Sequence, residues 1–310
     1  MNKKQLPGFF RQFFVGGCME FLDLKQVEAG WSVDKKCRAK GKDGKEYFLR
    51  ISPLEKMDRV KRAFSAQMQA WELGIPVSKP HGWEIAQDKV LMWEEWLPGQ
   101  DAEQVLPTLS QQSQNDYGQE AGTYLRLLHT LPAPEGIEDW ESRFNEKIDR
   151  KIAIYRECPL QYEGGEALIQ YILSHRSLLR GRPQTLQHGD YHVGNMMFCH
   201  NRLFIIDFDR PDAGDPWEEF NRIVWCAQLS PAFASGMIQG YFLGNPPLEF
   251  WVLLALYIAS NTLSSLPWAI PFGKKEVRTM MNQAREVLDW YDQMRTTIPS
   301  WYLPWEGKSN

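Results

Sequence analysis

Cysteine is scarce in this 310-residue chain, and its five copies are scattered without a CxxC spacing. Such a set suggests neither a disulfide framework nor a zinc site. The chain also lacks a basic excess, because its formal net charge is -4 and no run rich in Lys or Arg occurs. Proteins that bind nucleic acids usually carry such an excess. We therefore expect a protein of the reducing cytoplasm that does not bind nucleic acids.

Long apolar runs are missing as well. The N-terminal residues MNKKQLPGFFRQFF contain no apolar stretch followed by the small-residue cleavage site of a secretory signal. The most apolar segment, Phe250–Ala259, gives way to Ser260-Asn261-Thr262. It is much shorter than the roughly 20 residues that a membrane-spanning helix needs. We expect this segment to form a buried helix, and we expect no membrane partner.

The first hundred residues read as a small β-rich lobe with one helix. Residues 57–73 have apolar positions every three or four residues, which predicts a helix. Gly41-Lys42-Asp43-Gly44 is typical of a hairpin turn between two strands. The expected strands are Phe21–Glu28, Asp34–Ala39, Tyr47–Ile51 and Lys89–Trp93.

Helical patterns dominate after a break at residues 97–100. Ser110 is a candidate N-cap for a helix that carries one apolar stripe, and strands return only within residues 186–209. Further helices are expected at 141–157, 164–180, 217–229, 248–265 and 274–295. The fold class is therefore α+β with two lobes, a small antiparallel β-rich lobe over residues 1–97 and a larger, mainly helical lobe over residues 98–310.

The residues from His188 to Asp209 carry the chemistry. Two short apolar runs, 196–198 and 203–206, flank a polar link, which is the pattern of a hairpin. Folding the chain at this link brings Asn195 opposite Ile206 and beside Asp207. Asp190 lies five residues before Asn195, within reach of the same point. Asn and Asp side chains supply the hard oxygen ligands that Mg²⁺ prefers, and Asp190 could accept the proton of an attacking hydroxyl group.

Three motifs in this segment resemble one enzyme family. They are His188-Gly-Asp190-x-x-x-x-Asn195, Ile205-Ile-Asp207-Phe-Asp209 and Gly214-Asp215-Pro216. They look like those of the aminoglycoside phosphotransferase and choline kinase group, which shares the bilobal fold of protein kinases. The Asp-x-x-x-x-Asn spacing also matches the catalytic loop of protein kinases. Weaker similarities extend the resemblance over about residues 20–225.

The resemblance implies a role for each of these residues. Asp190 would be the catalytic base, His188 would orient the catalytic loop, and Asn195 and Asp207 would bind Mg²⁺. Asp215 would be structural. The reaction would move the γ-phosphate of ATP or GTP to a hydroxyl group of a small molecule.

The resemblance also implies that the N-terminal lobe binds the nucleotide. Adenine would bond to the hinge backbone near Glu95 and Leu97. The phosphate-covering turn would include Ser32 in Ala29-Gly30-Trp31-Ser32, although an ordinary hairpin explains a lone Gly-x-Ser turn equally well.

The third strand departs from the family's pattern. Arg50 stands where a phosphate-binding lysine is expected. Residues 57–73 offer Ala63 and Ser65 where the lysine's glutamate partner would lie. Arginine keeps the positive charge but is longer and stricter in geometry. Arg50 is therefore a candidate phosphate ligand without an evident partner.

Two other classes of protein remain to be weighed. A kinase-fold module that binds a nucleotide or ligand with little catalysis would explain the missing lysine, but Asp190, Asn195 and Asp207 are all retained. A metallophosphoesterase would need further His and Asp ligands on several loops, which the sequence does not offer.

The acceptor is left open between an amino sugar, an amino alcohol and a sugar metabolite. Carboxylates that could attract a cationic acceptor are Asp212, Glu218, Glu219, Asp289 and Asp292, and each could equally belong to a solvated helix face.

Overall fold

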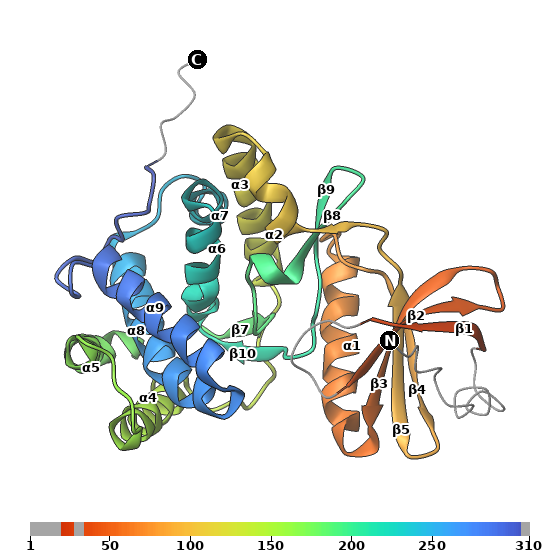
Figure 1. Ribbon diagram of the computed structural model, residues 1–310, viewed down its shortest axis with the longest axis horizontal. Helices are drawn as coiled ribbons and strands as arrows, with labels where there is room; N and C mark the ends of the chain where they lie inside the picture. The colour runs from red at the N-terminus through yellow and green to blue at the C-terminus, as the bar shows by residue number, and fades with distance from the viewer. Residues whose placement is uncertain (1–19, 28–33, 305–310) are drawn as a thin grey trace. The chain divides into compact units, whose positions relative to one another are not determined.

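The computed structural model describes residues 20–27 and 34–304, and the chain in it forms two compact units (Figure 1). The first unit comprises the residues up to Gln100 together with Met197–Pro211. The second comprises Asp101–Met196 and the residues from Asp212 onward. The lobe boundary that we predict at residue 97 assigns residues 197–211 to the second lobe, whereas in the structure they belong to the first unit. The mixed α+β class, with an N-terminal antiparallel sheet and a helical C-terminal part, is confirmed.

A five-stranded antiparallel sheet in the order β1-β2-β3-β5-β4 forms the first unit's framework. One face buries Cys37, Leu49 and Trp93, and the other packs Val90 and Met92 against helix α1 (Met57–Glu72). The strands are β1 (Phe21–Gln26), β2 (Lys35–Gly41), β3 (Glu46–Pro53), β4 (Pro80–Ala86) and β5 (Lys89–Glu95). All four expected strands and the helix are present.

Strand β4 was not predicted from the sequence. Its residues include Pro80 and Gly82, which ordinarily interrupt strands. The structure accommodates them because β4 is an edge strand whose register shifts between these two residues. Edge strands tolerate a missing N–H donor, so the sequence signal for this strand is weak.

The predicted hairpin of the catalytic segment is confirmed in strands β8 (Met196–Cys199) and β9 (Arg202–Ile205), which pair in a three-stranded sheet with β6 (Gln100–Asp101). His200 and Asn201 form its turn, both with positive φ, as a type I′ turn requires. The N–H of Ile205 donates to the Pro76 carbonyl at 2.8 Å and so ties the hairpin to the rest of the first unit.

Helices build the second unit. The longer ones are α3 (Gln111–Leu128), α4 (Trp140–Glu157), α5 (Gly165–His175), α6 (Ile223–Leu229), α7 (Pro231–Phe242), α8 (Leu248–Ala269) and α9 (Lys274–Trp290). Short elements are α2 (Ala102–Val105), η3 (Leu106–Thr108), η4 (Arg176–Leu179), η5 (Val193–Asn195), η6 (Glu218–Arg222) and η7 (Ile270–Phe272), with the paired strands β7 (Thr185–Gln187) and β10 (Asp212–Gly214). Ser110 caps α3 as expected, accepting from Ser113 N–H at 3.1 Å.

Helix α7 was missed because it is buried almost all round, so its sequence has no apolar and polar alternation to detect. It packs closely along α3 (Figure 1). A Cβ at Gly122 would lie 2.0 Å from the Met237 carbonyl oxygen, so only glycine allows this approach.

The apolar segment of α8 lies inside the second unit. The stretch Leu248–Phe272 is long and apolar enough to cross a membrane, but 72% of its most apolar window is buried within the structure. This is the behaviour of a core helix, in agreement with the expectation from the sequence.

Candidate active site

Arg50 forms the centre of an ion-pair network in the first unit. One of its terminal nitrogens lies 2.5 Å from Asp207 Oδ1 and the other lies 2.6 Å from Asp209 Oδ1. Arg59 from α1 pairs with the second oxygen of Asp209 and also donates to its backbone carbonyl at 3.0 Å. Arg50 therefore pairs with the Asp-Phe-Asp segment itself. Helix α1 offers no acidic partner and faces this region with Ala63 and Gln67.

A second cation, Lys36, reaches the same carboxylate from the neighbouring strand. Lys36 lies directly opposite Arg50 in the β2–β3 ladder, and its Nζ is 3.9 Å from Asp207 Oδ2. Burial and the nearby Arg50 lower the pKa of Lys36, although Asp207 opposes this effect. Among the described residues, Asp207 is the only carboxylate within ion-pair distance of Lys36. Asp207 itself has φ +64°, a strained backbone of the kind found at functional sites.

Glu94 of β5 lines a small pocket next to Arg50 and Asp207. Its carboxyl group accepts a hydrogen bond from Gln67, which also donates to the Ser78 carbonyl at 2.8 Å. Burial raises the pKa of Glu94 to about 7, against the opposing effects of the Gln67 hydrogen bond and the charge of Arg50.

Some of the backbone groups near the predicted hinge already form hydrogen bonds within the chain. The Glu95 N–H donates to the Lys79 carbonyl at 2.9 Å, and the Glu95 carbonyl accepts from the Ser78 hydroxyl. The Leu97 carbonyl accepts from Gly99 N–H at 3.0 Å, while the Leu97 N–H bonds to no backbone carbonyl of the described chain. Ser32 lies outside the described residues.

The second unit holds Asp190 between two cationic or protonatable side chains. Arg222 Nε is 3.3 Å from Asp190 Oδ1, and His192 Nε2 is 3.7 Å from the same oxygen. His192 Nδ1 accepts from Gly194 N–H at 3.1 Å, so the proton of the ring belongs on Nε2, toward Asp190. Burial alone would raise the pKa of Asp190, but His192 and Arg222 outweigh it and hold this pKa well below its usual range. Asp190 is therefore an ionised carboxylate, available to accept a proton.

Hydrogen bonds to buried groups fix the backbone of this catalytic loop. Gly189 has φ +84°, which favours glycine, and its N–H donates to both carboxylate oxygens of Glu219 at 2.9 and 3.2 Å. Fully buried His188 accepts at Nδ1 from Asp190 N–H at 3.3 Å and contacts the Tyr191 ring edge to face. His188 thus contacts the backbone of Asp190, and its orienting role stays a prediction.

Asn195 has the geometry of an oxygen ligand. Its amide nitrogen donates to the Asp190 carbonyl at 2.8 Å, which fixes the side chain. Its Oδ1 accepts no hydrogen bond from the part of the chain that the structure describes. Mg²⁺ binds hard oxygen donors. The Oδ1 of Asn195 in the second unit is such a donor, and so is the half-exposed carboxylate of Asp207 in the first unit. No cluster of three or more His, Cys, Asp or Glu suited to a metal is found within residues 20–27 and 34–304.

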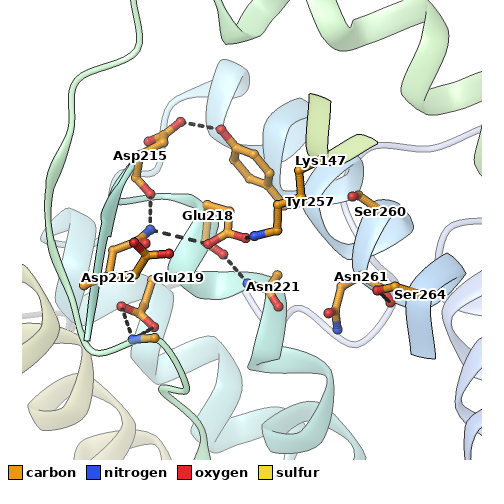
Figure 2. Close-up of polar contacts among 12 residues, drawn as sticks. Lys147, Asp212, Asp215, Glu218, Glu219, Asn221, Tyr257, Ser260, Asn261 and Ser264 are labelled. Atoms are coloured by element: carbon orange, nitrogen blue, oxygen red, sulfur yellow. Dashed lines mark hydrogen bonds and ion pairs between the residues drawn. The ribbon is translucent and has the colours of Figure 1, made fainter. Parts of the chain in front are cut away.

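Asp215 is completely buried and serves as a structural anchor (Figure 2). Its carboxylate accepts from Arg182 at 2.7 and 3.0 Å, from the Tyr257 hydroxyl at 2.5 Å and from Trp217 N–H at 3.0 Å. These hydrogen bonds satisfy the buried charge and fix the chain between β10 and η6.

Sequence reasoning missed three residues of these sites. Lys36 is an ordinary strand lysine until the register places it opposite Arg50, and Arg222 lies in a helical stretch that reads as core. His192 lies in a loop and, in the sequence alone, has no apparent partner in the site. Its position two residues after Asp190 is the one signal that could have pointed to it.

Together these features define a small-molecule phosphotransferase with a protein-kinase-like fold. The sequence model of the phosphotransferase enzyme family matches residues 23–251, and the chain belongs to this family. The resemblance stated from the sequence and the predicted enzyme class are therefore confirmed.

Several solved structures share this fold at low sequence identity. A thermostable mutant of aminoglycoside phosphotransferase APH(4)-Ia is 12% identical with a TM-score of 0.62, covering 87% of this chain and 94% of that one. Macrolide 2'-phosphotransferase MphH from Brachybacterium faecium is 17% identical (TM-score 0.59; 86% and 93% covered). A choline/ethanolamine kinase family protein from Mesorhizobium loti is 16% identical (TM-score 0.63; 89% and 91% covered). No curated protein sequence matches the chain.

Proposed function

We propose that the protein transfers the γ-phosphate of ATP to a hydroxyl group of a small molecule, with Asp190 as the base. The observation that carries this proposal is the position of Asp190, an ionised and half-exposed carboxylate held by His192 and Arg222. Asp190 would take the proton of the acceptor hydroxyl as its oxygen bonds to the γ-phosphorus. The bond from phosphorus to the bridging oxygen then breaks, and ADP leaves.

The donor side of the proposal depends on residues of the first unit. Lys36 and Arg50 would bind the nucleotide phosphates, since both are buried cations aimed at the Asp207 carboxylate. The Leu97 N–H would bond to adenine. ATP as the donor is supported by related APH(4)-Ia structures, one described as a complex with ADP and another with AMP-PNP, each also holding hygromycin B.

Mg²⁺ would be held by Asn195 Oδ1 and the Asp207 carboxylate. When bound, the ion neutralises phosphate charge in the transition state. Arg50 must then share Asp207 with the metal, and its second partner, Asp209, keeps the guanidinium in place.

An assay of ADP release with Mg²⁺ and a panel of sugars, amino sugars and amino alcohols tests this proposal, with GTP run beside ATP. Asp190→Asn should lower turnover by at least a hundredfold while the dissociation constant of AMP-PNP stays unchanged. Nucleotide binding without turnover for any acceptor, and with no effect of Asp190→Asn, would instead favour a binding module.

A further inference from the structure

Three cations lie around the carboxylate of Glu218 in the second unit. Lys147 of α4 lies 3.2 Å from Glu218 Oε1, and Arg222 bridges from this group to Asp190. Lys147, Lys151 and Arg222 all act electrostatically on the carboxylate of Glu218. Three cations thus face two carboxylates, Glu218 and the Asp190 partner of Arg222, which leaves one positive charge over in this group.

Lys151 is the cation of this group without an acidic partner. Its Nζ lies 3.4 Å from the Ser260 hydroxyl, and no carboxylate within the described ranges lies at ion-pair distance from it. Burial, with the neighbouring charge of Lys147, lowers the pKa of Lys151 to about 7. An ammonium in such surroundings is costly unless an anion joins it.

Helix α8 lines the same region with neutral polar groups. Ser260, Asn261 and Ser264 interrupt its apolar sequence, and Figure 2 shows them on the same helix as Tyr257. The side-chain amide of Asn261 makes no hydrogen bond to the part of the chain that is described, whereas its backbone carbonyl accepts from the hydroxyls of Ser264 and Ser265. Such groups suit the hydroxyls of a sugar or polyol.

The carboxylates that could attract a cationic acceptor are largely neutralised. Glu218 pairs with Lys147, Asp212 lies 3.6 Å from Arg143, and Glu219 is buried against the Gly189 N–H. Asp292 pairs with Arg295, so only exposed Asp289 is left of the five. The charge of the region therefore disfavours a polycationic amino sugar.

We propose that the acceptor is an anionic polyhydroxy compound, a sugar acid or a sugar phosphate, whose charged group binds among Lys151, Lys147 and Arg222. Asn261 and the serines of α8 bind its hydroxyls. One hydroxyl of the compound then lies at Asp190. This assignment rests on the proposed function and specifies its substrate class.

Binding of inorganic phosphate tests the subsite directly. The protein is first saturated with AMP-PNP and Mg²⁺, so that the donor's own phosphate site is filled, and phosphate is then titrated by calorimetry. The expected result is saturable binding that Lys151→Met weakens at least tenfold. Lys275→Met, at an exposed position on α9, is the matched control and should leave the affinity unchanged. Absent binding, or equal binding to both variants, overturns the anionic subsite.

Turnover of four matched acceptors tests the substrate class: glucose, glucosamine, glucuronate and glucose 6-phosphate. We expect the highest kcat/KM for glucuronate or for glucose 6-phosphate. Which of the two is preferred shows whether the subsite binds a carboxylate or a phosphate. The KM for the preferred anion should be raised in Lys151→Met. A higher kcat/KM for glucosamine overturns the inference but leaves the phosphotransferase activity standing. By contrast, AMP-PNP that fails to bind contradicts the proposed function itself.

A stability measurement guards against a purely structural role. Lys151→Met replaces a half-buried amine with an apolar chain of similar length, so the variant should melt at or above the temperature of the wild type. A variant that melts well below the wild type, with its phosphate affinity unchanged, marks Lys151 as structural and overturns the assignment.

Discussion

Lys36 lies directly opposite Arg50 across strands β2 and β3, and both side chains reach the carboxylate of Asp207. Arg50 makes two ion pairs, with Asp207 and Asp209, whereas Lys36 has one distant contact. The arginine is thus fixed by the protein, and the lysine keeps donors for a ligand. The phosphate-binding lysine that the third strand lacks has a candidate on the second strand.

Lys36→Met should therefore weaken nucleotide binding. A charge-assisted hydrogen bond contributes about 1.5–3 kcal/mol, so we expect the dissociation constant of AMP-PNP to rise by roughly 10–100-fold. Calorimetric titration of AMP-PNP with Mg²⁺ measures this effect. Lys40→Met on the same strand, where the side chain is exposed, is the control. Equal affinities for the two variants would remove Lys36 from the phosphate site.

Arg50→Lys should impair the protein even though the charge is kept. A lysine cannot span Asp207 and Asp209 as the planar guanidinium does, so one of these carboxylates loses one of its two cationic partners. We expect a loss of about 1–3 kcal/mol in the free energy of unfolding and a lower kcat. Urea denaturation and steady-state assays measure the two quantities. A variant as stable as the wild type would show that Arg59 alone satisfies Asp209.

The sequence predicted the catalytic hairpin because its signals are local. Short apolar runs flank the polar link that contains His200-Asn201, and a type I′ turn needs only two residues of positive φ. The motif from Asp190 to Asn195 is likewise contiguous. The backbone that these residues need can therefore be read from neighbouring positions.

The partners of the site could not be read in this way. The approach of Lys36 to Asp207 depends on the register between β2 and β3 and on the return of residues 197–211 to the first unit. Arg222 meets Asp190 only through the packing of η6 against the catalytic loop. The carboxylates expected to attract a cation were likewise found to be paired, which depends on distant residues such as Lys147.

Glu94 should make the stability of the protein depend on pH. Its pKa is about 7 in the folded state, above the ordinary value of 4.5, so the folded state binds more protons between these two values. The free energy of unfolding should therefore fall as the pH rises through this window, by about 3 kcal/mol at most. Glu94→Gln lacks this ionisation, so urea denaturation should show its stability relative to the wild type increasing from pH 4.5 to pH 8. A difference that stays constant over this range would contradict the raised pKa.

His192→Ala should slow phosphate transfer without weakening donor binding. The imidazole presents Nε2 to Asp190 while Nδ1 accepts from Gly194 N–H, so it fixes both the base and the start of η5. Without it, Asp190 is oriented by Arg222 alone, and we expect kcat to fall by about tenfold, at the low end of what positioned acid–base groups contribute. The KM for ATP should not change, because the proposed function assigns the donor phosphates to Lys36 and Arg50 and not to His192. His192→Gln should recover part of the rate, since its amide can donate a hydrogen bond to Asp190, and His175→Ala on α5 should behave as the wild type. If His192→Ala raised the KM for ATP and left kcat intact, the residue would belong to the donor site and not to the base.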